Sequence, residues 1–302
     1  MNVGVIDIGS NSIKCLVATR GNPFKTLFES SLPTRVQSLK EPNGTSVITP
    51  HGIDQVIQAI HKLLTVMEPY RPKKIEIVAT STIRDATNRQ DVQSAVQSAT
   101  GYPLLILSGK QEAQDIAQGL TTDPFLKNLN TFFACDLGGG SLECIDYRDN
   151  TLHALDSFPL GAVRLCKALW PEFENPFDHT TQSKIETHIQ SLLTQSKTIQ
   201  LQHQHPLVFC GGGLAVALNL MEKPIHSRNH IPIKDLQNLL SDISELTLPE
   251  RLALPHMPVN RADVLPVALT TVICVANQLG VNSLIYSYHN LKYGRAKSLL
   301  GL

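Results

Sequence analysis

The sequence has no excess of either charge, since 26 Lys and Arg residues balance 26 Asp and Glu residues over 302 positions. A dedicated nucleic-acid-binding protein usually carries a basic excess, so the composition argues against that class. A polyanionic ligand would have to be attracted by local basic side chains and backbone dipoles, because the net field is close to zero.

The chain also lacks long apolar runs and paired cysteines. No apolar stretch approaches the ~20 residues of a membrane-spanning helix, and the N-terminus shows no signal-peptide pattern. The six cysteines are scattered without a CxxC pair, which is typical of a reduced chain that uses them as small hydrophobic residues. We therefore expect a cytoplasmic protein that engages neither membranes nor nucleic acids.

One segment of the sequence recurs at a constant offset of 129 residues, since Asp7–Leu16 aligns with Asp136–Ile145. Both copies read as an apolar strand, an acidic residue, a small-residue turn and a second apolar strand. Elsewhere strands alternate with helical stripes, which is typical of an α/β fold. The repeat predicts two similar domains, residues 1–128 and 129–302, whose glycine turns line an intervening cleft.

Small-residue turns follow both aspartates of the repeat. Glycine permits close backbone approach, so successive N–H groups can converge on an anion, and hydroxyl or amide side chains add donors. The alternative is a tight hairpin turn that the Asp merely caps. A third glycine turn leads into a helix N-terminus, and the three together favour phosphate binding. The expected phosphate-binding residues of these turns are Ser10, Asn11, Ser12, Gly138, Gly139, Gly140, Ser141, Gly211 and Gly212.

Six segments, taken in order, resemble the signatures of the exopolyphosphatase and guanosine pentaphosphate phosphatase family. They are Asp7–Lys14, Ala79–Ala86, Ser108–Ala113, Asp136–Glu143, Pro159–Arg164 and Arg261–Asp263. The resemblance implies the fold of actin, hexokinase and heat-shock ATPases, with two ribonuclease-H-like α/β domains facing each other across a cleft. Longer relatives add C-terminal helical domains. This chain ends before any such extension, so we expect a short two-domain member.

The resemblance also implies roles for several charged residues. Glu112 matches the glutamate of the family's Ser-Gly-x-x-Glu-Ala motif and is the expected catalytic base, because phosphoanhydride hydrolysis needs a carboxylate to activate water. Without the resemblance, Glu112 would be interpreted as a surface carboxylate in the first turn of a helix, where the helix dipole favours an anion. Arg84 matches an arginine that faces the bound phosphates, and a guanidinium can grip phosphate bidentately. The alternative role for Arg84 is a structural ion pair with Asp85 at the surface. Arg164 is assigned to phosphate binding in the same way.

Asp136 and Glu143 form the expected magnesium pair, and Asp7 is the third expected metal residue. Asp136 and Glu143 stand seven residues apart on either side of a turn, so two adjacent antiparallel strands would bring them together. Unpaired buried carboxylates are costly, which makes a cation a sensible partner. For Glu143 a solvent-facing strand position is the alternative.

These features predict Mg²⁺-dependent hydrolysis of terminal phosphates on inorganic polyphosphate, pppGpp or both. One alternative is an ATP-dependent kinase of the same fold, against which the Ser108–Ala113 motif stands. Another is a non-catalytic alarmone or polyphosphate sensor. The segment Ser287–Gly294, which departs from the family's usual motif, favours a sensor, whereas the presence of Glu112 argues against it.

That altered segment stands where relatives usually have Ser-Asp-Arg-Gly-Leu-Arg-Glu-Gly, and Gln111 stands where many have a second acid. Substrate preference, the physiological pathway and the presence of a homodimer stay open. The balanced charge favours short polyphosphate or guanosine pentaphosphate over very long chains.

Overall fold

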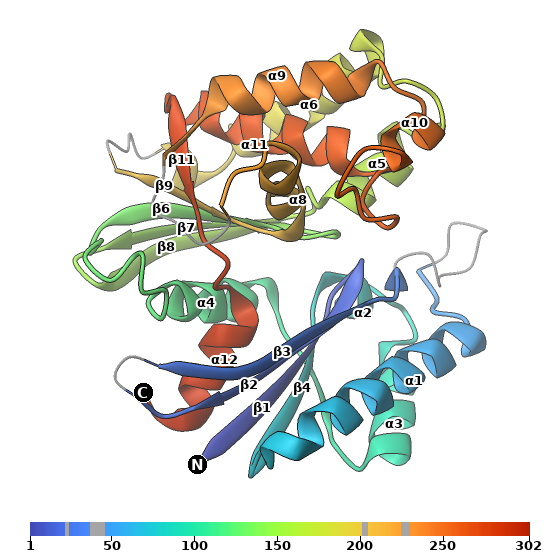
Figure 1. The fold of residues 1–302 in the computed structure, drawn as a ribbon, viewed down its shortest axis with the longest axis vertical. Coiled ribbons are helices and arrows are strands. Elements are labelled where there is room, and N and C mark those ends of the chain that lie inside the picture. Colours follow the sequence, from blue (N-terminus) through green and yellow to red (C-terminus); the bar gives the residue numbers. More distant parts are fainter. Residues whose placement is uncertain (22–23, 37–45, 201–204, 225–229) are drawn as a thin grey trace. The chain divides into compact units, whose positions relative to one another are not determined.

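The computed structural model describes residues 1–21, 24–36, 46–200, 205–224 and 230–302 (Figure 1). The chain forms two compact units, Met1–Pro124 with His289–Leu302, and Phe125–Tyr288. The sequence placed all of residues 129–302 in the second domain. In the structure the final segment belongs to the first unit, because helix α12 (Leu291–Leu300) packs on α4 (Gly109–Leu120) and on β1 (Asn2–Ile8).

The first unit is built on a five-stranded sheet of order β3-β2-β1-β4-β5. β1, β2 (Ser12–Thr19) and β3 (Lys25–Pro33) are antiparallel, whereas β4 (Lys74–Ala79) and β5 (Leu104–Ile106) run parallel to β1. Helices α1 (Pro50–Met67) and α3 (Arg89–Thr100) pack on one face, and α12 lies on the other with α4 against it (Figure 1). The short elements of this unit are η2 (Glu68–Tyr70) and α2 (Ser81–Arg84).

Local chemistry explains why α1 begins where it does. Thr49 Oγ1 accepts a hydrogen bond from Gly52 N at 3.0 Å, and Pro50 occupies the first turn, where no backbone donor is needed. The inward stripe of the helix, with Val56, Ile60 and other apolar side chains, joins the core of the sheet. A Thr-Pro pair directly before an apolar helical stripe therefore accounts for the start of α1.

The second unit repeats this topology in a six-stranded sheet of order β10-β11-β9-β6-β7-β8. Its strands are β6 (Phe132–Leu137), β7 (Leu142–Arg148), β8 (Thr151–Phe158), β9 (Leu207–Cys210), β10 (His230–Pro232) and β11 (Ser283–Tyr286). β6, β7 and β8 are antiparallel, β9 is parallel to β6, and β11 is parallel to β9. Strand β10 is an addition at the edge, antiparallel to β11.

The helices of the second unit are α5 (Ala162–Leu169), α6 (His179–Leu193), α7 (Lys197–Gln200), α8 (Gly212–Leu220), α9 (Ile233–Ser244), α10 (Leu248–Leu252) and α11 (Leu265–Gln278). Helix α11 is nearly fully buried and packs against α5, α6, α8 and α9. No helix among the described residues is long and apolar enough to cross a membrane.

The 129-residue repeat corresponds to equivalent strands of the two units. Asp7 lies opposite Lys14 in the β1–β2 pair, and Asp136 lies opposite Glu143 in the β6–β7 pair. Each aspartate is therefore the next-to-last residue of its strand, one position before the strand ends at the small-residue turn. Both units are mixed α/β with the same core strand order, which confirms the predicted fold class.

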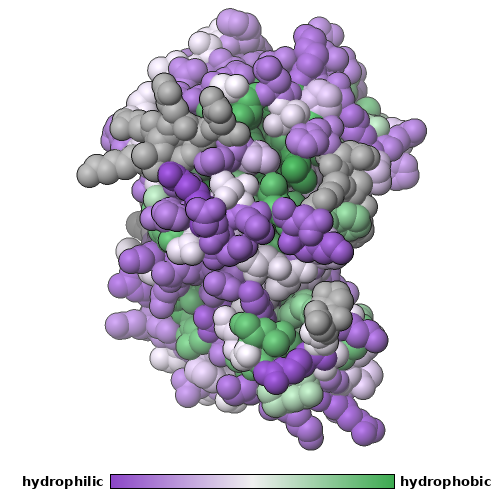
Figure 2. Space-filling model, turned by 90° about the vertical axis from the view of Figure 1, so that its left-hand side faces the viewer, coloured by the Kyte–Doolittle hydropathy of each residue, from purple (hydrophilic) through white to green (hydrophobic). Residues whose placement is uncertain are grey.

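Apolar side chains are concentrated in a separate core within each unit. The face in Figure 2 is mainly hydrophilic, with apolar atoms in separate small areas. Large exposed apolar residues of the described chain are scattered along the sequence, namely Met1, Val66, Leu105, Phe125, Leu252, Val259 and Leu302.

Candidate active site

Hydroxyl groups gather where the first turn meets α2. Thr82 Oγ1 donates to Ser10 Oγ at 2.5 Å, and Ser81 Oγ lies 3.3 Å from the same oxygen. The turn is closed by Gly9 N, which donates to Ser12 O at 3.1 Å. The side chains of Ser10, Asn11 and Ser12 are all buried. The structure thus supplies a compact group of hydroxyls, the donors that phosphate oxygens accept from.

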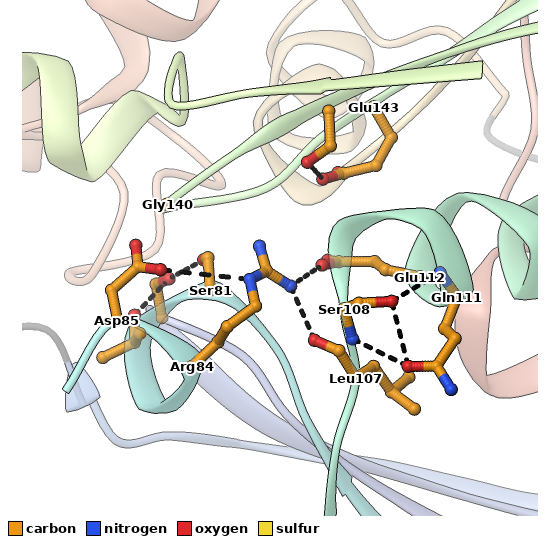
Figure 3. A network of polar contacts seen from close by, with 12 residues as sticks. Ser81, Arg84, Asp85, Leu107, Ser108, Gln111, Glu112, Gly140 and Glu143 are labelled. Carbon is orange, nitrogen blue, oxygen red and sulfur yellow. Dashed lines mark hydrogen bonds and ion pairs between the residues drawn. The ribbon is translucent and has the colours of Figure 1, made fainter. Parts of the chain in front are cut away.

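Arg84 and Glu112 meet in the first unit (Figure 3). Arg84 Nη1 donates to Glu112 Oε2 at 2.7 Å and to Leu107 O at 2.9 Å. The Asp85 carboxylate is 3.9 Å from Arg84 Nε, so the surface pair exists but is the longer contact. The expected catalytic base and the expected phosphate-binding arginine are therefore direct partners, and the guanidinium orients the carboxylate.

The first turn of α4 explains Gln111, which stands where many relatives have an acid. Gln111 N donates to Ser108 Oγ at 3.2 Å, and Ser108 N donates to Gln111 Oε1 at 2.9 Å, which forms a capping box. Glu112 follows in the same turn, where the helix dipole favours an anion. Gln111 therefore fixes the start of the helix that carries Glu112.

Asp7 is buried, and its Oδ1 atom has no hydrogen-bond partner within the described structure. Burial raises the pKa of Asp7, whereas the nearby Lys14 and Lys292 ammonium groups lower it. An orphaned carboxylate oxygen suits a cation or a water molecule. Two ammonium groups already lie beside Asp7, however, so its surroundings fit a divalent cation less well than the sequence predicts.

Asp136 and Glu143 lie side by side in the second unit, as the turn between them predicts. Glu143 is 1% exposed, so the alternative interpretation, in which this carboxylate faces solvent, is wrong. Ser157 Oγ donates to Glu143 Oε1 at 2.8 Å. Two adjacent buried carboxylates suit Mg²⁺, which is often held by one or two carboxylates together with water and substrate oxygens.

A larger metal cage is not found in the described part of the chain, where no three His, Cys, Asp or Glu side chains gather as a metal site. The cation expected at Asp136 and Glu143 would therefore take its remaining ligands from water or substrate. Cation binding stays a prediction.

Arg164 is tied to the second glycine turn. Its Nε atom donates to Gly140 O at 2.7 Å, and its backbone N–H donates to Gly139 O at 3.0 Å. A Cβ atom on Gly161 would lie 2.3 Å from backbone atoms of Gly140, so only glycine allows the start of α5 to approach the turn this closely. Arg164 supports the turn in this structure, and its phosphate-binding role stays a prediction.

The third glycine turn reveals a side chain that the sequence reasoning missed. Gly211 has φ 116°, and a Cβ atom there would lie 2.4 Å from Leu137 O. A Cβ atom on Gly212 would lie 2.6 Å from Arg261 Nη2, so the Arg261 guanidinium covers the first residue of α8. The signal was available, because Arg261 opens one of the six family-like segments.

The altered C-terminal residues are packing residues of the first unit. Lys292 and Tyr293 are 4% and 3% exposed. Tyr293 donates its hydroxyl to Glu29, and Lys292 Nζ lies 3.7 Å from Glu29 Oε2. Burial lowers the pKa of Lys292 to about 8, while Glu29 opposes that effect. Strand β3 thus supplies an acidic partner for residues of α12, and this part of the altered segment gives the sensor alternative no support.

The model of the Ppx/GppA phosphatase family matches residues 5–301. Exopolyphosphatase 1 of Mycobacterium tuberculosis is 30% identical over 174 residues, which cover 57% of this chain and 50% of that protein. The chain thus spans about half the length of this relative. Exopolyphosphatase 1 of Mycobacterium leprae is 25% identical over 277 residues, 87% of this chain and 78% of that protein.

Solved structures show the same fold. An exopolyphosphatase from Cytophaga hutchinsonii has a TM-score of 0.88 and 21% identity over 100% of this chain and 98% of that one. A Ppx/GppA family member from Aquifex aeolicus has a TM-score of 0.81 and 18% identity over the same shares. These similarities confirm the expected fold of the actin and hexokinase type.

Proposed function

The chain belongs to the Ppx/GppA phosphatase family, and we propose that it is a Mg²⁺-dependent phosphohydrolase that releases terminal phosphate from inorganic polyphosphate, pppGpp or both. The observation that carries the proposal is the 2.7 Å contact between Arg84 and Glu112 in the unit that also holds the Ser10 hydroxyl cluster. An anion-binding arginine and a carboxylate able to accept a proton are two of the groups that promote attack by water on a phosphoryl group.

Glu112 would take a proton from the attacking water as the new P–O bond forms, and the bridging P–O bond of the substrate breaks. The products are orthophosphate and a substrate shortened by one phosphate. Arg84 would bind the oxygens of the transferring phosphoryl group, where negative charge must be stabilised. Ser10 and Ser12 would donate hydrogen bonds to phosphate oxygens.

Asp136 and Glu143 would hold Mg²⁺, which when bound neutralises negative charge on phosphate oxygens. The backbone N–H groups of Gly138–Gly140 and Gly211–Gly212, with Ser141, would complete the set of phosphate donors in the second unit. Arg164 would contribute by holding the Gly140 turn in place. Asp7 would order water through its orphaned Oδ1 atom.

A cytoplasmic setting agrees with the cysteines, all six of which are buried thiols outside any disulfide. The proposed activity involves a phosphoanhydride substrate and neither a nucleic acid nor a membrane. A homodimer stays an open prediction, to be settled by light scattering.

Phosphate release from polyphosphate, pppGpp and ATP, measured with and without EDTA, tests the proposed function. We expect Mg²⁺-dependent release of orthophosphate when water is the only acceptor of the phosphoryl group. Turnover only when an acceptor becomes phosphorylated would establish the kinase alternative. Tight binding of pppGpp or polyphosphate with no phosphate release would establish the sensor alternative.

A further inference from the structure

Three strands of the second unit place Asp136, Glu143 and Ser157 in one row across the sheet. Asp136 lies opposite Glu143 in the β6–β7 pair, and Glu143 lies opposite Ser157 in the β7–β8 pair. Residues directly opposite each other in antiparallel strands project from the same face. From this position the Ser157 hydroxyl donates to Glu143 Oε1 at 2.8 Å (Glu143 is labelled in Figure 3).

The hydrogen bond from Ser157 restrains one oxygen of the buried Glu143 carboxylate. Glu143 has three rotatable side-chain bonds and is 1% exposed, so bulk water cannot hold its oxygens in place. A hydroxyl donor fixes one oxygen and leaves the negative charge intact. Ser157 itself is an exposed residue near the end of β8, and the chain continues through Pro159 to Gly161, which packs on the glycine turn.

The first unit contains the same row with a different central residue. Asp7 lies opposite Lys14, and Lys14 lies opposite Ser31. This row combines one carboxylate with one ammonium group, whereas the row in the second unit combines two carboxylates. The second row therefore places two carboxylates opposite each other, and its serine lies opposite a carboxylate, whereas Ser31 lies opposite the Lys14 ammonium group.

We propose that Ser157 is a positioning residue that holds Glu143 in the rotamer that binds the divalent cation. The inference rests on the proposed function, since it assigns the cation to Asp136 and Glu143. Partners that hydrogen-bond a ligating carboxylate commonly contribute about 10–100-fold to metal affinity. Ser157→Ala should weaken the cation affinity by an amount in that range.

A titration with Mn²⁺, monitored by electron paramagnetic resonance, measures the cation affinity without relying on turnover. The variants are Ser157→Ala, Ser157→Thr, which keeps the hydroxyl, and Glu143→Gln. Ser31→Ala is the matched control, because Ser31 occupies the equivalent place in the first unit. Thermal unfolding of each variant verifies that the fold is kept, which we expect because Ser157 and Ser31 are exposed.

We expect the Mn²⁺ dissociation constant to rise about 10–100-fold in Ser157→Ala. The dissociation constants of Ser157→Thr and Ser31→Ala should stay close to that of the wild type. If Glu143→Gln abolishes binding while Ser157→Ala binds like wild type, the inference is overturned and the proposed function stands. An equal loss in Ser31→Ala would also overturn it. If the wild type binds no Mn²⁺, the cation assignment fails, and the inference fails with it.

Discussion

Arg84 Nη1 donates a hydrogen bond to Glu112 Oε2 across 2.7 Å, joining residues that are 28 positions apart in the sequence. The same nitrogen also donates to Leu107 O at 2.9 Å, so the main chain before α4 holds the guanidinium while it orients the carboxylate. Glu112 is buried, and it lies in the first turn of a helix that a capping box starts at Ser108. This pair is the basis of the first prediction.

Glu112→Gln should lower kcat by about 10²–10⁴ and leave KM little changed, because a general base acts in the transition state. Steady-state phosphate release measures both constants. Asp91→Asn is a suitable control, since Asp91 is also an acidic residue in the first turn of a helix, α3, and lies on the surface. Wild-type turnover in Glu112→Gln would show that Glu112 is not the base.

Asp136→Asn should raise the Mg²⁺ concentration needed for half-maximal activity, because an amide is a poorer ligand for a hard cation than a carboxylate. The measurement is phosphate release as a function of free Mg²⁺. Asp235→Asn, which removes a carboxylate from a surface pair with Lys223, should leave the Mg²⁺ requirement unchanged. Full wild-type activity in excess EDTA would contradict the cation assignment.

Gly294→Ala should destabilise the first unit by about 1–3 kcal/mol, the usual effect of overpacking a close contact. A Cβ atom at Gly294 would lie 1.8 Å from Asp115 O, where α12 crosses α4. Urea unfolding measures the loss. Ser298→Ala changes an exposed position of the same helix and should be nearly neutral. Equal stability of Gly294→Ala and Ser298→Ala would show that α12 can shift away from α4 at little cost.

Asp115 should make folding stability depend on pH. Burial raises its pKa from 3.8 to about 6, against the opposing effect of Arg295. The folded state therefore binds this proton more tightly than the unfolded state. Its contribution to stability is fully present below about pH 4 and is lost as pH rises through about 6.

Asp115→Asn should remove that dependence, so the difference in urea midpoint between variant and wild type should change between pH 4 and pH 6 and stay constant above. Arg295 also contacts Glu76, so the variant keeps one partner for the guanidinium. A difference that does not vary with pH would mean that folding leaves the pKa of Asp115 unchanged.

Short polyphosphate or pppGpp should be preferred over very long polyphosphate. A long polyanion gains affinity through many basic contacts, each of which releases about one counterion. This chain has equal numbers of acidic and basic residues, so no net positive charge attracts a long polyanion, and the expected phosphate-binding cations are Arg84 and Arg164. Values of kcat/KM, expressed per chain end, should not rise with length at fixed salt. A steady rise up to several hundred phosphates would contradict this prediction.

The local features of the site were determined by the sequence. Strand, acid and small-residue turn occupy consecutive positions, so their order alone indicated two turns of the same kind at Asp7 and Asp136. The seven-residue spacing of Asp136 and Glu143 was enough to predict their pairing, because an antiparallel hairpin places such residues opposite each other. The capped start of α1 at Thr49-Pro50 is equally local.

Only the tertiary structure decided which distant groups meet. The return of α12 to the first unit, the contact of Tyr293 with Glu29, and that of Arg84 with Glu112 all join residues far apart in the chain. Such contacts depend on strand order and on which face of a sheet is covered, and neither is encoded by neighbouring residues. The Ser157 contact needs a third strand in register. For the same reason the changes at Tyr288 and Tyr293 suggested a different ligand preference, whereas in the structure Tyr293 is buried and donates a hydrogen bond to Glu29 within the first unit.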